Sequence, residues 1–168
     1  MLNTDNEGLL SFYKEADEFF ERIIPRKEST VVQEADALME EARQIILDPS
    51  PDNVVLYQAK LASILASLGE ITAEAESELV AMKSYLEECY ADEFTDSKEI
   101  LEATKPRVLK AEVETAIAKR HRKDERLAKM LDVRVRRYKA KLQGGGRIVE
   151  ALQNRIIQFR RERERSNL

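Results

Sequence analysis

The stretch from Pro106 to Leu142 constrains the fold of this chain more than any other. It contains no glycine, and its only proline stands at the first position, where a helix tolerates one. A row of mostly apolar residues recurs along it in steps of four and three, the pattern of a long helix packed along one side. This row consists of Ile117, His121, Asp124, Ala128, Leu131, Val135, Tyr138 and Leu142. The stretch therefore predicts one continuous helix.

A second face of the same predicted helix carries lysine and arginine. Cations at helical spacing neutralise phosphates and release counterions, so they bind a nucleic acid without sequence preference. Only Tyr138 and Phe159 supply aromatic rings in the basic part of the chain, so we expect electrostatics to outweigh base stacking. The predicted DNA contacts are Lys119, Arg120, Arg122, Lys123, Arg126, Lys129, Arg134, Arg136, Arg137 and Lys141.

The charge of the chain is divided between its two ends. Residues 1–104 hold 8 Lys and Arg against 24 Asp and Glu, a net charge of −16. Residues 105–168 hold 20 against 8, a net charge of +12. Such asymmetry indicates a nucleic-acid or membrane contact by the basic part. The alternative is that the two parts neutralise each other, within or between subunits, and one assembly can combine both.

The rest of the chain predicts further amphipathic helices. A composition of 43% hydrophobic and 36% charged residues with few glycines and prolines suits long helices with narrow apolar stripes. Thr30 is predicted to cap one of these helices, and Gly69 to mark a close helix crossing. The predicted helices span 4–24, 30–47, 53–90 and 147–165. The predicted breaks are the double-proline turn 48–52, the segment 91–105 and a hinge at Gly144–Gly146.

The predicted fold is all-α, with three parts. An acidic N-terminal helix pair occupies 1–47, a long antiparallel helical hairpin 53–142, and a basic amphipathic helix 147–168. The last helix can fold back onto the hairpin or pack on a neighbouring subunit, and we favour the neighbour. Its predicted oligomerisation stripe is Ile148, Leu152, Ile156 and Phe159.

The sequence predicts no enzyme, metal site or cofactor. One histidine excludes paired di-iron helices and a zincin motif, and the single Cys89 is read as a small core residue. The glycine tract lacks the Lys and Ser or Thr of a phosphate loop. His121 and Asp124 are read as a polar register device or a rim rather than a ligand-facing opening. No run approaches the 18 residues of a membrane span and no signal peptide is recognised, so we expect a cytoplasmic protein.

Four segments in one order carry a family resemblance. LYQAKLASIL opens a helical segment and SYLEECYADEF closes it; KPRVLKAEVETAIAKRHRKDERLAKML and RIVEALQNRIIQF follow. This layout, over 53–160, resembles the UvsY-type recombination mediator proteins of tailed phages. The resemblance implies a non-enzymatic, ring-like homo-oligomer in the host cytoplasm. It would bind single-stranded DNA and help load a RecA-like recombinase onto strands covered by single-strand binding protein.

Carried over, the resemblance assigns the DNA contacts to the cations of 106–142 and subunit association to the helix after Gly146. The acidic helices 4–47 have no counterpart in it and are suited to docking a partner protein. A competing class is a structural or assembly protein, such as a phage scaffold or coiled-coil adapter, whose charged halves adhere to each other. A third class is a small helical inhibitor acting through the acidic half.

Overall fold

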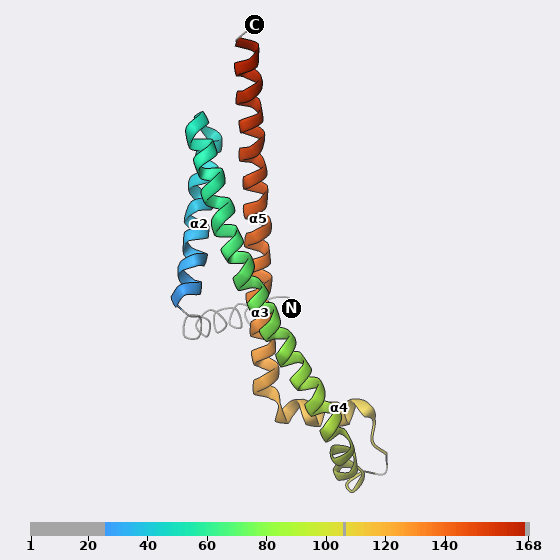
Figure 1. Cartoon of the computed structure of the whole chain (residues 1–168). Helices are drawn as coiled ribbons and strands as arrows, with labels where there is room; N and C mark the ends of the chain where they lie inside the picture. The colour runs from blue at the N-terminus through green and yellow to red at the C-terminus, as the bar shows by residue number, and fades with distance from the viewer. Residues whose placement is uncertain (1–25, 106, 167–168) are drawn as a thin grey trace, which may run out of the picture. The chain divides into compact units, whose positions relative to one another are not determined.

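The structure, a computed structural model, describes residues 26–105 and 107–166. Within these ranges it contains four helices and no strand, which confirms the predicted all-α fold. The predicted helix 4–24 lies outside the described residues. The helices are α2 (Arg26–Leu47), α3 (Pro51–Glu102), α4 (Lys110–Arg120) and α5 (Arg122–Ser166) (Figure 1).

Several helix boundaries differ from prediction. The helix α2 already includes Arg26, so Thr30 lies inside it and does not cap it. The helix α3 continues to Glu102, so most of the predicted break 91–105 is helical. Tertiary packing outweighs the weak helix propensity of Thr95 and Asp96. Residues on the packed side continue the helical spacing and are buried or half-buried, namely Phe94, Ser97 and Leu101.

The predicted helix 106–142 begins only at Lys110 and is interrupted at one residue. His121 leaves the helical conformation, with φ −91° and ψ 19°. Its N–H still donates to the Ile117 carbonyl at 3.0 Å, and its carbonyl accepts from the Glu125 N–H at 2.9 Å. The chain therefore changes helix without an intervening loop. At the other end of α4, the Leu109 N–H donates to the Glu112 carboxylate at 3.1 Å.

The glycine tract is helical, so the predicted hinge was wrong. The helix α5 runs through Gly144–Gly146, and none of these glycines has a positive φ. A Cβ on Gly145 would lie 2.5 Å from Cδ2 of Leu65. This glycine therefore lets α5 approach α3 closely. The close crossing predicted at Gly69 is not found there, because nothing lies within 4 Å of a Cβ built on that residue.

The chain divides into two compact units. Of the described residues, unit 1 contains 26–73 and 136–166, and unit 2 contains 74–135. Because α3 and α5 each contribute to both units, the division departs from the three parts predicted at 1–47, 53–142 and 147–168.

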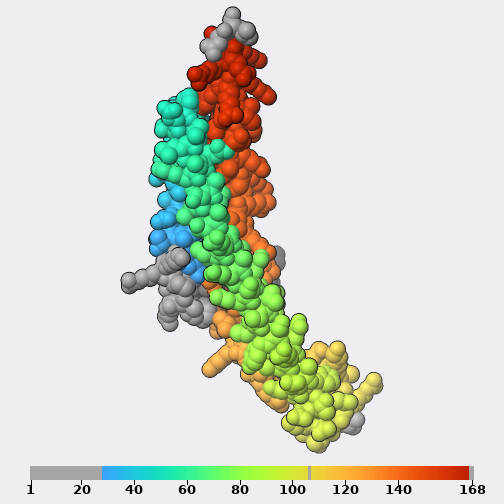
Figure 2. Space-filling model, viewed as in Figure 1, coloured from blue at the N-terminus to red at the C-terminus, as the bar shows by residue number. Residues whose placement is uncertain are grey.

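Unit 1 is built from α2, the first part of α3 and the last part of α5 (Figures 1 and 2). Its portions of α3 and α5 are antiparallel, since Leu65 lies against Gly145 while Gln58 bonds to Gln153. The buried cluster of this unit is Met39, Ala42, Val54, Leu61, Ile148, Leu152 and Ile156.

Unit 2 is built from the last part of α3, α4 and the first part of α5. Its portions of α3 and α5 are also antiparallel, because Glu78 bonds to Arg134 while Tyr90 bonds to Glu125. Its buried apolar residues are Ala75, Leu79, Val113, Ile117, Ala128, Met130, Leu131 and Val135.

One helix is apolar along part of its length. An 18-residue window in α3 is long and apolar enough to cross a membrane by length and composition. The prediction that no run approaches this length was therefore wrong. The core helix of a soluble protein satisfies the same criteria, although only 17% of this window is buried.

Candidate nucleic-acid interface

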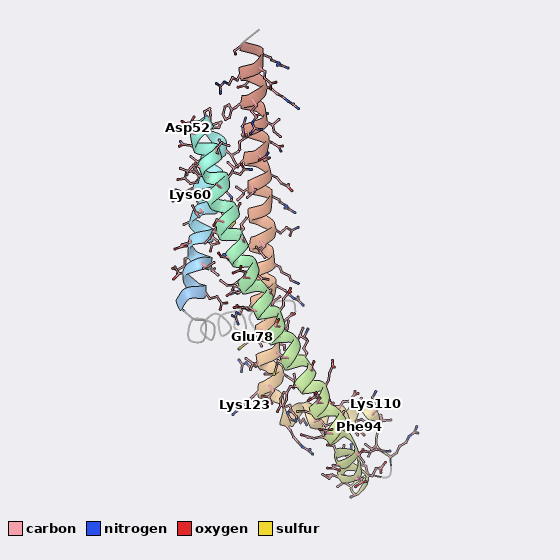
Figure 3. The ribbon with its side chains drawn as sticks, viewed as in Figure 1. Asp52, Lys60, Glu78, Phe94, Lys110 and Lys123 are labelled. Carbon is pink, nitrogen blue, oxygen red and sulfur yellow. The ribbon has the colours of Figure 1, made fainter. Side chains whose placement is uncertain are left out.

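Five exposed cations gather around the junction of α4 and α5 in unit 2. Lys119 lies in the last turn of α4, and the others lie in the first turns of α5. Lys123 projects outward from the start of α5 (Figure 3). We call this group the cation patch, and it consists of Lys119, Arg122, Lys123, Arg126 and Lys129.

Four members of the cation patch are without internal partners. Arg126 has an interaction within the chain. By contrast, no ion pair joins Lys119, Arg122, Lys123 or Lys129 to any residue in the part of the chain that the structure describes. Exposed ammonium and guanidinium groups that lack a protein carboxylate can bind phosphate.

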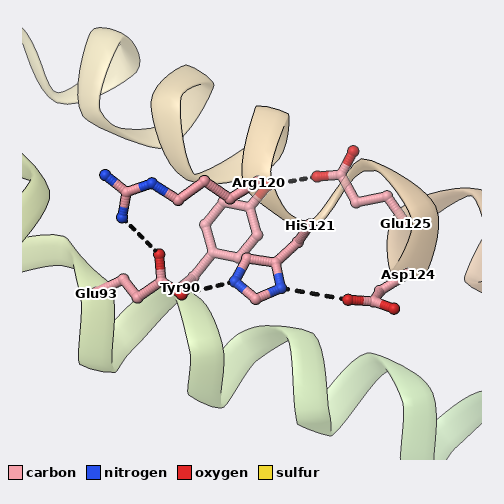
Figure 4. A network of polar contacts seen from close by, with 6 residues as sticks. All are labelled: Tyr90, Glu93, Arg120, His121, Asp124 and Glu125. Atoms are coloured by element: carbon pink, nitrogen blue, oxygen red, sulfur yellow. Dashed lines mark hydrogen bonds and ion pairs between the residues drawn. The ribbon is translucent and has the colours of Figure 1, made fainter.

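Hydrogen bonds between α3 and the junction of α4 with α5 position the cation patch. Figure 4 shows His121 between two carboxylates, with Nε2 at 2.7 Å from Glu93 and Nδ1 at 3.3 Å from Asp124. Arg120 donates to the other oxygen of Glu93 at 2.9 Å. Only 14% of the His121 side chain is exposed. These bonds fix the α4–α5 break against α3, so His121 and Asp124 neither continue a regular seam nor open toward a ligand.

The surroundings of His121 and Glu93 favour the charged form of each side chain. The carboxylate of Glu93, and then that of Asp124, raise the pKa of His121. The hydrogen bonds from His121 and then Arg120 lower the pKa of Glu93. A protonated imidazole donates from both nitrogens, so His121 carries a positive charge beside the cation patch when it is protonated.

The second predicted cation cluster is largely internal. Arg134 is buried and donates to Glu78 at 2.7 Å. Lys141 is paired with Asp36 of α2. Interactions within the chain also engage Arg136, Arg137 and Lys139. Burial and internal pairing remove Arg134 from the surface offered to phosphates, although the sequence placed it among the DNA contacts.

The last turns of α5 form a separate basic segment of unit 1. Arg155 donates to the Ile46 carbonyl at 3.4 Å and to Gln158 at 3.1 Å. Beyond it, residues 160–166 are all exposed, and Figure 2 shows this end of α5 standing clear of α2 and α3.

The predicted oligomerisation stripe packs within its own chain. Ile148, Leu152 and Ile156 belong to the buried cluster of unit 1, and Phe159 packs against it. The last helix thus takes the folded-back alternative, in place of the favoured contact with a neighbouring subunit. These residues are buried because α2 and α3 cover them.

The aromatic residues near the patch come from the acidic half of the chain. Tyr138 is buried and donates to Glu28, and Phe159 packs on the unit 1 core. The two aromatic rings of the basic part are therefore engaged within the protein. Tyr90 of α3 instead donates to Glu125, next to the patch (Figure 4). Burial, followed by this hydrogen bond, raises the pKa of Tyr90 to about 12.

Tyr90 was not among the predicted site residues, because the predicted nucleic-acid contacts were all in the basic part of the chain and Tyr90 lies in the acidic part. A shallow groove of about 440 Å³ adjoins this residue, lined by Lys83, Leu86, Glu87, Tyr90 and Glu125. The helical spacing of Lys83, Leu86 and Tyr90 on one face of α3 was the available signal, but their proximity to α5 was not visible in it. Cys89, read as a core residue, is only half-buried.

The acidic and basic parts of the chain correspond largely to two helices, because α3 is acidic and α5 is basic. The helix α3 contains 3 Lys and Arg against 12 Asp and Glu, and α5 contains 15 against 6. The pair of Glu78 with Arg134 shows that some of this charge is neutralised within unit 2.

No metal or family assignment accompanies this surface. Residues 26–105 and 107–166 contain no group of three or more His, Cys, Asp or Glu that could hold a metal ion. Comparison of the chain with protein-family models, characterised proteins and solved structures finds no match.

Proposed function

We propose that this protein is a non-enzymatic, sequence-independent binder of single-stranded DNA that acts through the cation patch of unit 2. The supporting observation is that Lys119, Arg122, Lys123 and Lys129 are exposed without an ion pair to any described residue. Other cations of the basic part, such as Arg134 and Lys141, pair with carboxylates of the chain. The cations of the patch, gathered at the junction of two helices, therefore form a surface suited to a polyanion.

The role that we propose for this binding is recombination mediation, on the strength of the UvsY-type resemblance. A mediator must hold a strand without reading its sequence, because it acts wherever a recombinase is loaded. Contacts limited to phosphates meet that requirement. We accordingly propose a RecA-like recombinase and single-strand binding protein as partners, and a cytoplasmic location in the host of a phage.

The proposed assembly is a homo-oligomer that uses a surface other than the predicted stripe. The start of α3 leaves Val55 and Leu56 about half exposed, at 53% and 48%, and Leu47 at the end of α2 is 76% exposed. Contact with a second copy of the chain would remove these apolar side chains from water. Sedimentation velocity of wild type and of Val55→Glu/Leu56→Glu tests this, with dissociation expected in the variant.

Fluorescence anisotropy of a labelled single-stranded oligonucleotide, titrated at several salt concentrations, tests the binding surface. The variant replaces Lys119, Arg122, Lys123 and Lys129 by Ala. Its matched control replaces the four exposed arginines at the end of α5, Arg160, Arg161, Arg163 and Arg165, with the same change of net charge.

We expect tight binding by wild type that weakens steeply with salt. Four phosphate contacts correspond to a slope of about −3 in log K against log salt for a single strand. The patch variant should lose most of the affinity and most of this slope, while the control retains both. Absence of binding by wild type at low salt would refute the proposed function. Equal losses in the two variants would refute its assignment to the patch.

The second candidate is a structural or assembly protein. The internal pairing of acidic α3 with basic α5 and the exposed apolar side of α3 favour it. Such a protein would form oligomers in the sedimentation experiment and show no salt-dependent DNA binding in the titration.

A further inference from the structure

The groove of unit 2 combines an apolar floor with carboxylates. Lys83, Leu86, Glu87 and Tyr90 share one face of α3, and Glu125 of α5 completes the lining. The Tyr90 hydroxyl donates to Glu125, which holds the ring in place. A pKa of about 12 keeps this phenol neutral at physiological pH. The groove therefore presents a fixed, uncharged aromatic ring next to an aliphatic side chain.

The groove lies on the same side of α5 as part of the cation patch. Arg122 precedes Glu125 by three residues and Lys129 follows it by four, and residues at these spacings are neighbours on a helix surface. Both cations are exposed and have no ion pair to a described residue. Phosphates held at Arg122 and Lys129 would therefore lie on the side of α5 that carries Glu125, a lining residue of the groove.

The carboxylates of the groove are hydrogen-bond acceptors only. Glu87 is exposed and makes no hydrogen bond or ion pair with the rest of the described chain. A carboxylate accepts from the exocyclic amino group of cytosine. Thymine has a carbonyl oxygen at the same position, and two acceptors facing each other repel. A groove lined by carboxylates therefore discriminates between cytosine and thymine, although the two bases are similar in size.

We propose that this groove is a nucleobase subsite that takes an unstacked base bearing an exocyclic amino group, with cytosine favoured over thymine. Tyr90 and Leu86 contact the face of the base, and Glu87 accepts from its amino group. The subsite deepens the proposed function and rests on it, because the cation patch must first hold the strand. It also supplies a reason for single strands to bind better than duplexes, since paired bases cannot enter.

The test compares labelled oligo(dC) and oligo(dT) of equal length by anisotropy, at several salt concentrations. Two variants are used, Tyr90→Leu and Glu87→Ala. The matched control is Tyr57→Leu, because Tyr57 of unit 1 also donates to a glutamate, Glu41, at 2.9 Å. Circular dichroism verifies that each variant is folded.

We expect wild type to bind oligo(dC) more tightly than oligo(dT). Tyr90→Leu should weaken oligo(dC) binding by roughly tenfold, which is typical for loss of a base-stacking ring, with an unchanged salt slope because no phosphate contact is removed. Tyr57→Leu should leave the affinity unchanged. Glu87→Ala should bring the dC to dT affinity ratio toward one, and any general gain from losing a negative charge cancels in that ratio.

The subsite and the proposed function fail in different ways. Wild-type affinity and base preference in both groove variants, together with loss of binding in the patch variant, would refute the subsite and leave the proposed function standing. No binding by wild type would refute both. If Tyr90→Leu does not fold, Glu87→Ala still decides, because exposed Glu87 has no described partner to lose.

Discussion

Units 1 and 2 are built from the same two long helices, yet they use their cations differently. In unit 1, Lys141 pairs with Asp36 and Arg155 bonds to the carbonyl of Ile46, while the four arginines of 160–166 are exposed at the end of α5. In unit 2, Lys119, Arg122, Lys123 and Lys129 remain exposed without an ion pair to any described residue. A row of cations in a sequence is therefore available to an external anion only where the fold brings no carboxylate to it.

Disruption of the unit 1 core should give the largest effect. Leu152 is fully buried in its core, so Leu152→Ala should lower the free energy of unfolding by about 2–5 kcal/mol. Urea denaturation followed by circular dichroism measures this. The control is Ile157→Ala on the same helix, where the residue is 36% exposed, and a clearly smaller loss is expected because less apolar surface is buried there.

DNA binding gives the second readout for Leu152→Ala. Under conditions where the variant remains folded, anisotropy should show unchanged affinity, because the cation patch belongs to unit 2. A loss of affinity comparable to that of the patch variant would mean that the two units do not separate structure from binding as proposed.

Arg134 and Lys129 lie on the same helix of unit 2, but Arg134 is buried and Lys129 is exposed. Arg134→Ala removes a part-buried hydrogen bond to a carboxylate and should cost about 1–3 kcal/mol of stability. The salt dependence of DNA binding should not change. Lys129→Ala should do the reverse, with a stability change below about 0.5 kcal/mol and a salt slope reduced by about 0.7. Urea denaturation measures the stability of both variants, and anisotropy at several salt concentrations measures the salt slope of their DNA binding. A similar change of salt slope in both variants would contradict the different roles of Arg134 and Lys129.

The glycine tract of unit 1 gives a smaller effect. Gly144→Ala and Gly146→Ala should each stabilise the protein by about 0.5–1 kcal/mol, because both positions are helical and nothing lies within 4 Å of an added Cβ. Gly145→Ala should lose that gain, since its Cβ would meet Leu65 at 2.5 Å. Thermal unfolding of the three variants measures their relative stability. Equal behaviour at the three positions would contradict the helix packing and restore the hinge.

Sequence periodicity predicted the packed faces well. Of the row along 106–142, Ile117, Ala128, Leu131, Val135 and Tyr138 are buried. In α2, three apolar residues at helical spacing are likewise buried, namely Ala35, Met39 and Ala42. Helical spacing is a local property, so a single sequence contains it.

Contacts between distant segments were not predictable in the same way. Three consecutive glycines favour a break unless a partner such as Leu65 requires their small size, and that partner lies far away in the sequence. The helical state of 91–102 depends on packing on the side of Phe94 and Ser97. The internal pairing of Arg134 depends on Glu78, and the groove on Tyr90 approaching Glu125. Each of these is a tertiary property that a charge or propensity pattern does not contain.

The smallest predicted effect concerns pH and distinguishes unit 2 by its histidine, the only one in the chain. The raised pKa of His121 means that its stabilisation is fully present below the ordinary value of 6.5 and is lost as pH rises through the higher folded value. The lowered pKa of Glu93 means that its contribution is present above 4.5 and is lost as pH falls through the folded value. The junction is therefore most stable between these two limits.

Melting temperatures of wild type and His121→Gln, measured just below pH 6.5 and well above it, test this pH dependence. Wild type should exceed the variant at the lower pH, and the difference should shrink at the higher pH, where the imidazole is neutral and one nitrogen no longer donates. A pH-independent difference would show that His121 contributes by packing alone. The same two pH values should alter DNA binding slightly in the same direction, because the imidazolium lies between Arg120 and Arg122 and adds to the positive potential that attracts phosphate.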